Sequence, residues 1–381
     1  MRVLIVNAHG DDASCGGAEQ MVGELTDQLD ARGIGVAYLQ AFPSRVRGRD
    51  VERTVLHRTD WRDDSARRLK NHAGSVLGFP TGTLKQAIAQ HRPDVVHTHN
   101  LPGIDTGVWE AAHRLGLPVV HTIHDYYLLC PRVSLTRADG RPCRPSPLLC
   151  GLRTRRLARW APAVSHVVGC SQYVVDVHAH LFPAATSHVL RNPIVVPARP
   201  GHPVGSQPRV LGYIGSLDRI KGVDLLLEAS SQLGPRGFTL RLAGDGRLRE
   251  EVVRAAASSA NVEWAGRLLG EDKWRFLESC DLGLVPSVWA EPGGPTFTMA
   301  EWLAVGRPVL VSNRGGLGEV AGVYPGSMPI EPTVGSIVSA ISSLRDAGRW
   351  TDLVAKVEPI EGQGAEEWAE GYLAVYRSVT G

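Results

Sequence analysis

The sequence is poor in cysteine and lysine, and it has almost no excess of either charge. Six cysteines are scattered over 381 residues, which favours reduced thiols in a cytoplasmic protein over a disulfide framework. The 41 basic and 39 acidic side chains leave a formal net charge of +2, which argues against a nucleic-acid partner. Nearly all of the basic residues are arginines, so a lysine inside a motif is informative. The lysines are Lys70, Lys85, Lys221, Lys273 and Lys356.

Long apolar runs are absent as well. No stretch approaches the roughly 20 apolar residues that a membrane-spanning helix needs. The apolar run within Met1–Asn7 is too short for the core of a signal peptide, and it predicts a buried first strand. We therefore expect a cytoplasmic protein. The arginine-rich stretch Arg153–Arg159 predicts a solvated helix face, with peripheral contact to an anionic inner-membrane surface as the alternative.

What is present is the pattern of a folded α/β protein. Hydrophobic residues make up 43% and charged residues 21%, and the length exceeds what one hydrophobic core usually supports, so we expect two domains. Short β-branched runs alternate with amphipathic stretches such as Ala18–Arg32, which indicates βα units and parallel sheets. The predicted strands are Val3–Val6, Val36–Leu39, Val95–His97, Val119–Ile123, Val167–Gly169, His188–Leu190, Arg209–Ile214, Thr239–Ala243, Val262–Trp264, Leu282–Val285 and Pro308–Val311.

A stretch rich in proline and glycine divides the chain. Residues 196–208 predict a linker between an N-terminal domain of residues 1–195 and a C-terminal domain of residues 209–360, both Rossmann-like. Residues 361–381 form a separate tail. Its helical pattern carries Trp368, Tyr372 and Tyr376 at spacings of four, an aromatic stripe that we expect to pack against a domain.

Two motifs in the first half follow predicted strands. Gly16 and Gly17 open a helix after the first strand, where backbone N–H groups can approach an anion; a tight turn that requires glycine is the alternative. His124 follows Val119–Ile123, at the edge where ligands of open α/β sheets bind. A structural role for this histidine is the alternative, and the nearby pair His97 and His99 lacks the spacing of a zinc enzyme.

The second half carries a similar arrangement. Lys221 precedes a glycine in the turn after Arg209–Ile214, which suits a phosphate, with an exposed turn as the alternative. A Gly/Pro loop then bears Glu291 and leads into a helix that bears Glu301. Carboxylates at these positions can accept hydrogen bonds from sugar hydroxyls. The alternative for Glu301 is an acid in the first turn of a helix, where the helix dipole favours it.

In this order and spacing, the motifs resemble those of retaining glycosyltransferases of family 4. The resemblance covers nearly the whole chain, and it implies the GT-B fold, in which two Rossmann-like α/β domains face each other across a cleft and the last helix crosses back onto the N-terminal domain. The residues that carry it are Gly16–Glu19, His124, Gly215 with Lys221–Gly222, Ala243–Gly246, Pro286–Ser287, Glu291, Glu301 and Gly306–Val309.

The resemblance implies transfer of a sugar from a nucleotide diphosphate sugar to an acceptor hydroxyl, with retention and without a divalent metal or another cofactor. UDP is the favoured nucleotide and GDP a possible one. The implied catalytic residues are His124 near the reacting carbon, Lys221 on the donor diphosphate and Glu291 on the sugar hydroxyls. Glu301 is implied to hold the ribose hydroxyls. Further implied donor contacts are Gly16, Gly17, Ser216, Arg219, Gly244, Arg267, Gly294, Thr296, Phe297 and Thr298.

The chain departs from the family pattern at two places. Ser216 stands where family members often have an arginine five residues before the lysine, and Arg219 is the candidate replacement. Glu291 and Glu301 are ten residues apart where the family usually has eight, which predicts a loop two residues longer. An ungapped alignment would instead put Gly293 at the first glutamate position.

A local resemblance to a subset of these transferases covers His124 to Pro131 and the cysteines Cys130, Cys143 and Cys150. Three cysteines this close together are either unlinked thiols in an acceptor-side loop or ligands of a structural metal with a fourth group from elsewhere.

We expect a bacterial hexosyl- or N-acetylhexosaminyltransferase, monomeric or homodimeric, acting in glycan or secondary-metabolite biosynthesis on a small-molecule, lipid-linked or glycan acceptor. A GT-B sugar-nucleotide epimerase and a non-catalytic sugar-nucleotide-binding protein are the alternatives. The long segments 41–92 and 126–160 favour a transferase, because an epimerase needs no acceptor pocket. The joint presence of His124, Lys221 and Glu301 argues against a non-catalytic protein.

Overall fold

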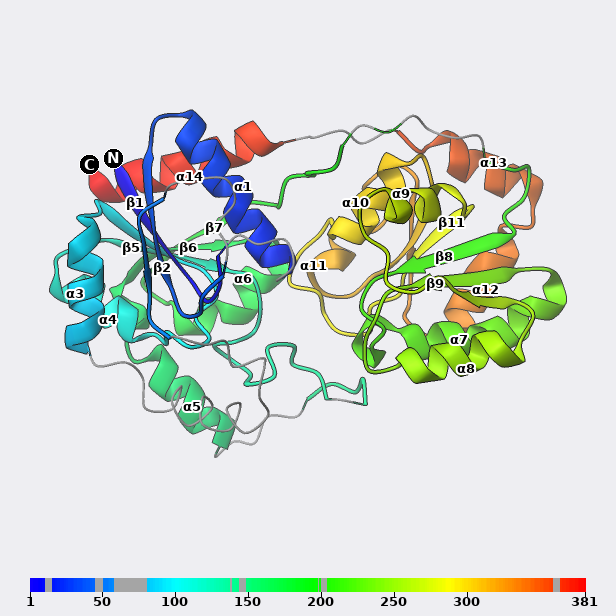
Figure 1. Ribbon diagram of the computed structural model, residues 1–381, viewed down its shortest axis with the longest axis horizontal. Coiled ribbons are helices and arrows are strands. Elements are labelled where there is room, and N and C mark those ends of the chain that lie inside the picture. The colour runs from blue at the N-terminus through cyan, green and yellow to red at the C-terminus, as the bar shows by residue number, and fades with distance from the viewer. Residues whose placement is uncertain are drawn as a thin grey trace. The chain divides into compact units, whose positions relative to one another are not determined.

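The computed structural model describes the whole chain except residues 11–15, 45–50, 58–80, 138, 144–148, 198, 200–203 and 359–363. The chain divides into two compact units (Figure 1). The first unit comprises Met1–Ser134, Arg144–Asn192 and Gly364–Gly381, and the second comprises Leu135–Cys143 and Pro193–Gln363.

The short segment Leu135–Cys143 corrects the expected domain boundary, because it lies within residues 1–195 but belongs to the second unit. It folds back on itself: the Cys143 amide donates to the Leu135 carbonyl at 2.7 Å, and the Arg137 amide donates to the Arg141 carbonyl at 2.8 Å. At its tip, a Cβ on Gly140 would lie 3.8 Å from Cβ of Arg219. We call this segment the hairpin.

The first unit is built on a parallel sheet in the order β3-β2-β1-β4-β5-β6-β7. In β1, the residues Val3 to Val6 are fully buried, as expected of a strand covered on both faces. The strands are β1 (Arg2–Asn7), β2 (Gly35–Gln40), β3 (Arg53–Val55), β4 (Val95–Thr98), β5 (Val119–Ile123), β6 (Val164–Gly169) and β7 (Thr186–Val189). The helices are α1 (Gly17–Ala31), α3 (Thr81–His91), α4 (Gly107–Arg114), α5 (Leu149–Ala158), α6 (Gln172–His178) and α14 (Ala365–Thr380).

The last helix, α14, packs on the first unit beside α1 (Figure 1). The aromatic stripe Trp368, Tyr372 and Tyr376 is buried there. The Tyr376 hydroxyl and Nδ1 of His97 share a hydrogen bond of 2.6 Å, and Arg32, directly after α1, pairs with Glu370 at 3.0 Å. The stripe is buried because an amphipathic helix is stabilised mainly by covering its apolar face.

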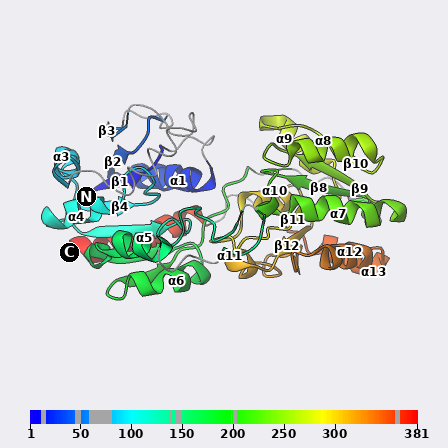
Figure 2. The ribbon, with the colours of Figure 1, turned by 90° about the horizontal axis from the view of Figure 1, so that it is seen from below.

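The second unit has a parallel sheet in the order β10-β9-β8-β11-β12-β13. Its strands are β8 (Val210–Ile214), β9 (Thr239–Ala243), β10 (Val262–Trp264), β11 (Leu282–Val285), β12 (Val309–Ser312) and β13 (Ser327–Ile330). Its helices are α7 (Val223–Leu233), α8 (Arg249–Ser258), α9 (Gly270–Glu278), α10 (Phe297–Ala304), α11 (Gly315–Gly318), α12 (Val334–Ser343) and α13 (Ala347–Ala355). Figure 2 shows these elements from a second direction.

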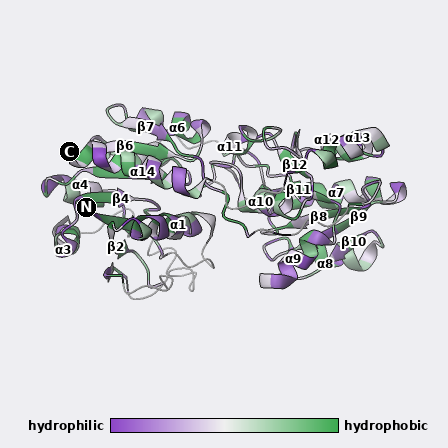
Figure 3. Ribbon diagram, turned by 90° about the horizontal axis from the view of Figure 1, so that it is seen from above, coloured by the Kyte–Doolittle hydropathy of each residue, from purple (hydrophilic) through white to green (hydrophobic). Residues whose placement is uncertain are grey.

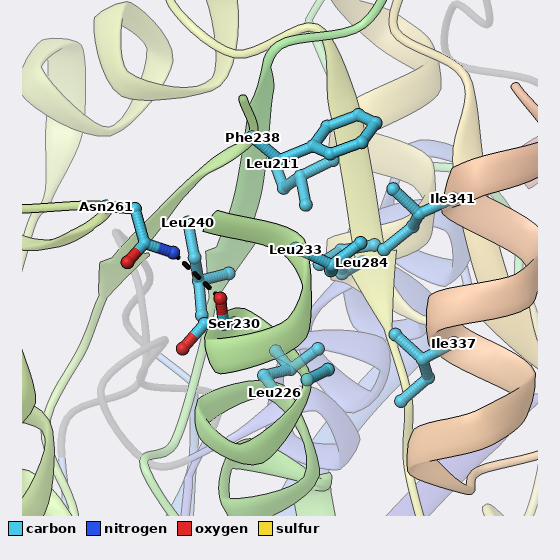
Figure 4. Close-up of a pocket in the computed structure, with 11 residues that line it drawn as sticks. Leu211, Leu226, Ser230, Leu233, Phe238, Leu240, Asn261, Leu284, Ile337 and Ile341 are labelled. Atoms are coloured by element: carbon cyan, nitrogen blue, oxygen red, sulfur yellow. Dashed lines mark hydrogen bonds between the residues drawn. The ribbon is translucent and has the colours of Figure 1, made fainter. Parts of the chain in front are cut away.

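Two hydrophobic clusters fill the second unit, one on each face of its sheet. One gathers apolar side chains of α7, α12 and α13 and the other those of α9 and α10, and the strands between them are mostly green in Figure 3. A small gap remains in the first cluster, where Leu226, Leu233 and Ile337 point toward one another (Figure 4). The Asn261 amide beside it donates to the Ser230 carbonyl at 2.9 Å. Since the lining is almost wholly apolar, we assign this gap to core packing.

In both sheets the chain adds strands first on one side of the starting strand and then on the other side. In the first unit β1 lies between β2 and β4, and in the second unit β8 lies between β9 and β11. Ligands of open α/β sheets bind beyond the carboxyl ends of the strands at such a switch point. The segments that follow β1 and β4, and those that follow β8 and β11, are therefore where functional side chains are expected.

Candidate functional site

In the second unit, the segment after β8 brings Lys221 against a buried carboxylate from the segment after β11. Lys221 Nζ donates to Oε1 of Glu291 at 2.7 Å, and the Glu291 side chain is only 7% exposed. Gly222 makes this approach possible. It has a φ of +77°, and a Cβ there would lie 2.2 Å from the Pro286 carbonyl oxygen, so any other residue would push the two segments apart.

Glu291 is held by a second donor. The Ser287 hydroxyl donates to the same Oε1 atom at 2.7 Å, and Lys221 Nζ lies 5.1 Å from the centre of the Trp289 ring. The Gly316 amide donates to the Glu291 carbonyl at 2.7 Å, which fixes the backbone of the loop. Lys221 and Glu291, both predicted from the sequence, are thus neighbours, and Ser287 completes the group. We call these three residues the lysine–glutamate cluster.

Two residues before Lys221 that were predicted to contact the donor, Ser216 and Arg219, form hydrogen bonds to carboxylates of the second unit. Ser216 donates to Asp218, and Arg219 Nη1 donates to Asp224 at 3.2 Å. Burial raises the pKa of Asp218, but hydrogen bonds from Ser216 and Arg247 outweigh it, so the net pKa is lowered. The Arg219 side chain is therefore already paired within the second unit.

Glu301 lies on α10 and is paired with a lysine that the sequence reasoning did not select. Lys273 Nζ of α9 donates to Oε1 of Glu301 at 2.7 Å. Burial raises the pKa of Glu301, and the Lys273 charge opposes this rise. Because α10 begins at Phe297, Glu301 lies beyond its first turn, and the alternative of a helix-start acid is wrong. The rarity of lysine was the one sequence signal that could have pointed to Lys273.

The start of α10 is formed by residues predicted as donor contacts. The Thr296 hydroxyl accepts a hydrogen bond from the Met299 amide at 3.2 Å and so caps the helix, while Phe297 and Thr298 are half-buried in its first turn. Gly294 is buried, and a Cβ there would lie 2.4 Å from a Val320 methyl group, so its small size serves packing.

The turn after β9 approaches the turn after β8 very closely. Gly244 has a φ of +136°, and a Cβ there would lie 1.8 Å from the Gly215 carbonyl oxygen. The Gly244 amide donates to the Gly266 carbonyl at 2.8 Å, which brings the exposed Arg267 to the same edge of the sheet. The predicted contacts Gly244 and Arg267 are therefore close to each other and to the turn before Ser216.

In the first unit, the carboxyl edge of the sheet is rich in histidine. Nδ1 of His99 and Nε2 of His124 share a hydrogen bond of 3.0 Å. His97 binds Tyr376 and also Thr122, the latter at 2.8 Å. Burial lowers the pKa of His124 to about 4 and that of His121 to about 3, and it holds the pKa values of His97 and His99 well below the usual range. At neutral pH these rings are uncharged.

The glycines before α1 lie beside a buried glutamate. Oε1 of Glu19 accepts a hydrogen bond from the Asn100 side chain at 3.3 Å, and a Cβ on Gly16 would lie 3.0 Å from Oε2 of Glu19. Gly16 has a φ of +146°, and Gly17 is the first residue of α1. Cys15, which precedes them in the sequence motif, lies outside the described residues. Glu19 and Asn100 are polar groups of this edge that the predicted site did not include.

A pocket opens at this edge, beside His124. It is lined by residues that follow β4 and β5, among them His99, Asn100, His124, Asp125 and Tyr127. The Tyr127 amide donates to Oδ1 of Asp125 at 2.7 Å. Burial raises the pKa of Asp125 to about 6, and the Glu19 charge adds to that rise. The pocket thus joins neutral imidazoles to a carboxyl group whose pKa is raised to about 6.

Among the described residues, no group of three or more His, Cys, Asp or Glu side chains is placed to hold a metal ion. Cys130, Cys143 and Cys150 are free thiols, and Cys143 belongs to the hairpin of the second unit whereas the other two belong to the first. No helix in the described ranges is long and apolar enough to cross a membrane.

Two family models match the chain. Residues 15–196 match the model described as Glycosyltransferase Family 4, and residues 208–346 match that of Glycosyl transferases group 1. A 42.6 kDa protein of the cps region of Klebsiella pneumoniae is 25% identical over 340 residues, which is 85% of this chain and 88% of that protein. The D-inositol 3-phosphate glycosyltransferase of Rhodococcus jostii is 28% identical over 334 residues, 80% of this chain and 71% of that enzyme.

Solved structures share the fold over almost the full length. Sucrose-phosphate synthase from Thermosynechococcus elongatus superposes with a TM-score of 0.67 at 17% identity, covering 99% of this chain and 97% of that one. A glycosyltransferase from Rickettsia africae gives a TM-score of 0.68 at 16% identity, covering 99% and 98%. With the two Rossmann-like units, the returning helix α14 and both family matches, the chain belongs to the family 4 glycosyltransferases of the GT-B fold.

Proposed function

We propose that this glycosyltransferase moves a hexosyl or N-acetylhexosaminyl group from a UDP-sugar to an acceptor hydroxyl, with retention of configuration and without a divalent metal. The observation that carries the proposal is the lysine–glutamate cluster beside the turn after β8. A lysine at this switch point is placed to meet the charge of a nucleoside diphosphate. Anabaena HepE, which shares the fold, was solved with UDP and with UDP-glucose, which favours UDP over other nucleotides.

Lys221 has the leading catalytic role in this proposal. Negative charge grows on the diphosphate as the glycosidic bond breaks, and a cation fixed in advance stabilises that charge more in the transition state than in the ground state. Glu291 and Ser287 fix Lys221 through one shared carboxylate oxygen. The second carboxylate oxygen of Glu291 is then left to accept from a sugar hydroxyl. N–H groups at the start of α10 add to the positive potential that takes the place of a metal ion.

Glu301 and His124 bind the donor through hydrogen bonds to its hydroxyl groups. The carboxylate of Glu301 accepts hydrogen bonds from the ribose hydroxyls, and Lys273 keeps it ionised and oriented despite its burial. His124 acts as a neutral hydrogen-bonding group for the transferred sugar, because its lowered pKa excludes an imidazolium at neutral pH.

For the retention that we propose, a front-face route is favoured over double displacement, because the described part of the first unit offers no suitable nucleophile. Double displacement needs a free carboxylate beneath the anomeric carbon. Asp125 is the carboxyl group next to His124, and it accepts from the Tyr127 amide and has a pKa raised to about 6. We infer a front-face substitution, in which the departing phosphate accepts the proton of the acceptor hydroxyl.

The test begins with donor selection. UDP-glucose, UDP-N-acetylglucosamine and GDP-mannose are screened for thermal stabilisation, since a ligand at 100 times its dissociation constant adds about 2.7 kcal/mol. The selected donor is then incubated in excess EDTA, with and without acceptors, and the anomeric configuration of the product is read by NMR. Full activity with an α-linked product from an α-linked donor supports the proposal. A strict metal requirement or an inverted product contradicts it, and conversion of the donor sugar without an acceptor indicates an epimerase.

A further inference from the structure

Tyr127, which lines the pocket of the first unit, and its neighbour Arg153 each have a buried hydrogen-bond donor without a partner in the part of the chain that the structure describes. The Tyr127 hydroxyl is buried and has no hydrogen-bond partner among the described residues, and the same holds for Nη1 of Arg153 on α5. The two side chains touch, because the Arg153 guanidinium lies 4.7 Å from the centre of the Tyr127 ring. A buried polar group without a partner costs on the order of 1–3 kcal/mol, more when it is charged, so two such groups side by side call for an explanation.

The charges around Arg153 set it apart from its neighbour on the same helix. Arg156 forms an ion pair with Asp105, whereas Nη1 of Arg153 has no hydrogen-bond partner among the described residues. The Asp125 carboxylate is close enough for its pKa to be lowered by Arg153, although it is not bonded to it. Arg153 is thus a cation stacked on an aromatic ring, and its Nη1 group has no hydrogen-bond partner in the described part of the chain.

We propose that Arg153 and Tyr127 form a subsite for an oxyanion carried by the acceptor, a phosphate monoester or a carboxylate. The inference deepens the proposed function and rests on it, because it assigns the pocket beside His124 to the acceptor. An oxyanion supplies the acceptor atoms that both donors lack, and a guanidinium recognises phosphate and carboxylate with two parallel N–H groups. Asp125 lines the same pocket, and its negative charge opposes the ligand, so the affinity reflects a balance between Arg153 and Asp125.

The structure offers variants with opposite expected signs. In Arg153→Gln the charge-assisted hydrogen bonds are lost, and because such bonds contribute about 1.5–3 kcal/mol, oxyanion affinity should fall roughly 10- to 100-fold. Asp125→Asn removes the opposing charge and should strengthen binding several-fold. Tyr127→Phe removes one neutral donor and should weaken binding about threefold to tenfold. Arg155→Gln, an exposed arginine on the same helix, is the matched control and should leave the affinity unchanged.

The experiment titrates the full-length protein, saturated with UDP, with inorganic phosphate and separately with acetate, and follows binding by NMR or calorimetry. UDP occupies the second unit, so a phosphate ion that still binds is not at the donor site. Preference for phosphate identifies a phosphate monoester as the acceptor group, and preference for acetate identifies a carboxylate. Arg153→Lys keeps the positive charge and should recover part of the affinity, which protects the test against a simple folding defect.

Three outcomes overturn the inference: no saturable binding of either anion, equal binding by the wild type and Arg153→Gln, or weaker binding in Asp125→Asn. These outcomes are separate from a failure of the proposed function. UDP affinity is measured on the same samples. If the wild type does not bind UDP, the donor assignment is contradicted, whereas the role of Arg153 is judged by the anion titrations alone.

Discussion

The sheets of the two units share the strand order around the switch point, but they carry different chemistry at the carboxyl edge. In the first unit the edge carries uncharged histidines that bind one another and α14, and in the second it carries lysine–glutamate pairs. All histidines of the sequence except His202 precede residue 193. The backbone therefore fixes only where a ligand binds. The side chains decide whether the edge presents neutral hydrogen-bonding groups or ionised pairs that can exchange a carboxylate for a phosphate.

The largest expected effect separates the two units by their response to acid. A histidine whose pKa is lowered on folding contributes stability that is present above the unfolded pKa of about 6.5 and is lost as the pH falls toward the folded pKa. For His124, whose pKa is lowered to about 4, the loss is on the order of 3 kcal/mol, and His121 and His178 add to it. We expect the first unit to lose most of its stability between pH 6.5 and 4.

Hydrogen exchange, corrected for the intrinsic pH dependence, measures this difference within one molecule. Protection of β4 and β5 should fall steeply from pH 7 to pH 5, while β8 and β11 of the second unit serve as the internal control. Equal loss of protection in both sheets would show that the buried histidines do not control the stability of the first unit.

The next effect concerns the ionised edge. Lys221→Ala should lower the rate of transfer by a factor of about 10²–10³, the usual loss when one strong electrostatic group is removed from a transition state. The protein should remain folded, although the Glu291 carboxylate loses its cation. Turnover at saturating donor is the measurement, and Lys356→Ala, an exposed lysine after α13, is the control. Near wild-type turnover in Lys221→Ala would rule out the role of the lysine–glutamate cluster.

A smaller effect is expected at the second ion pair. Glu301→Gln keeps one acceptor oxygen but adds an NH₂ donor and loses the charge that Lys273 stabilises. Affinity for the donor and for bare UDP should therefore fall together, by about tenfold, with the rate at saturation changed less. Calorimetry with UDP checks this, with Glu250→Gln on α8 as an exposed control. Unchanged UDP affinity would limit Glu301 to a structural ion pair.

The smallest effect tests the carboxyl group of Asp125, which lies next to His124. A pKa raised on folding means that Asp125 contributes its stability below its unfolded pKa of about 4 and loses it as the pH rises through about 6. Asp125→Asn should therefore stabilise the protein at pH 8 by about 1–2 kcal/mol, a value reduced because the side chain is only partly buried, and should have little effect near pH 4. Denaturant unfolding at the two pH values measures this. A variant that is less stable at pH 8 contradicts the prediction.

The sequence predicted most of the architecture but overlooked two strands. Runs of β-branched residues located β5, β9, β10 and β11 to the residue. In β13, Ser327 and Pro329 break the apolar pattern, and in β3 the residues Arg53 and Val55 are exposed. The edge strand β10 is just as short as β3 but was predicted, because its first residue, Val262, is apolar and buried. Local pattern therefore fails where a strand lacks a run of buried apolar residues.

The site shows the same division. The order of glycines, His124, Lys221, Glu291 and Glu301 along the chain was sufficient to predict the family. The pairing of Lys221 with Glu291 and of Lys273 with Glu301 could not be predicted, because the partners are 70 and 28 residues apart in the sequence. The position of the hairpin in the second unit was equally hidden, since its contacts are with residues distant in sequence.

Hydrophobic period and glycine placement are local properties, so the α/β class, the order of the strands along the chain and the aromatic stripe of α14 could be predicted from the sequence alone. Which charges are paired, and which donors are left without a partner, could not. Burial and charge pairing depend on groups that come together through the fold, and these determine that His124 is neutral, that Glu301 is stabilised by Lys273 and that Nη1 of Arg153 has no partner among the described residues.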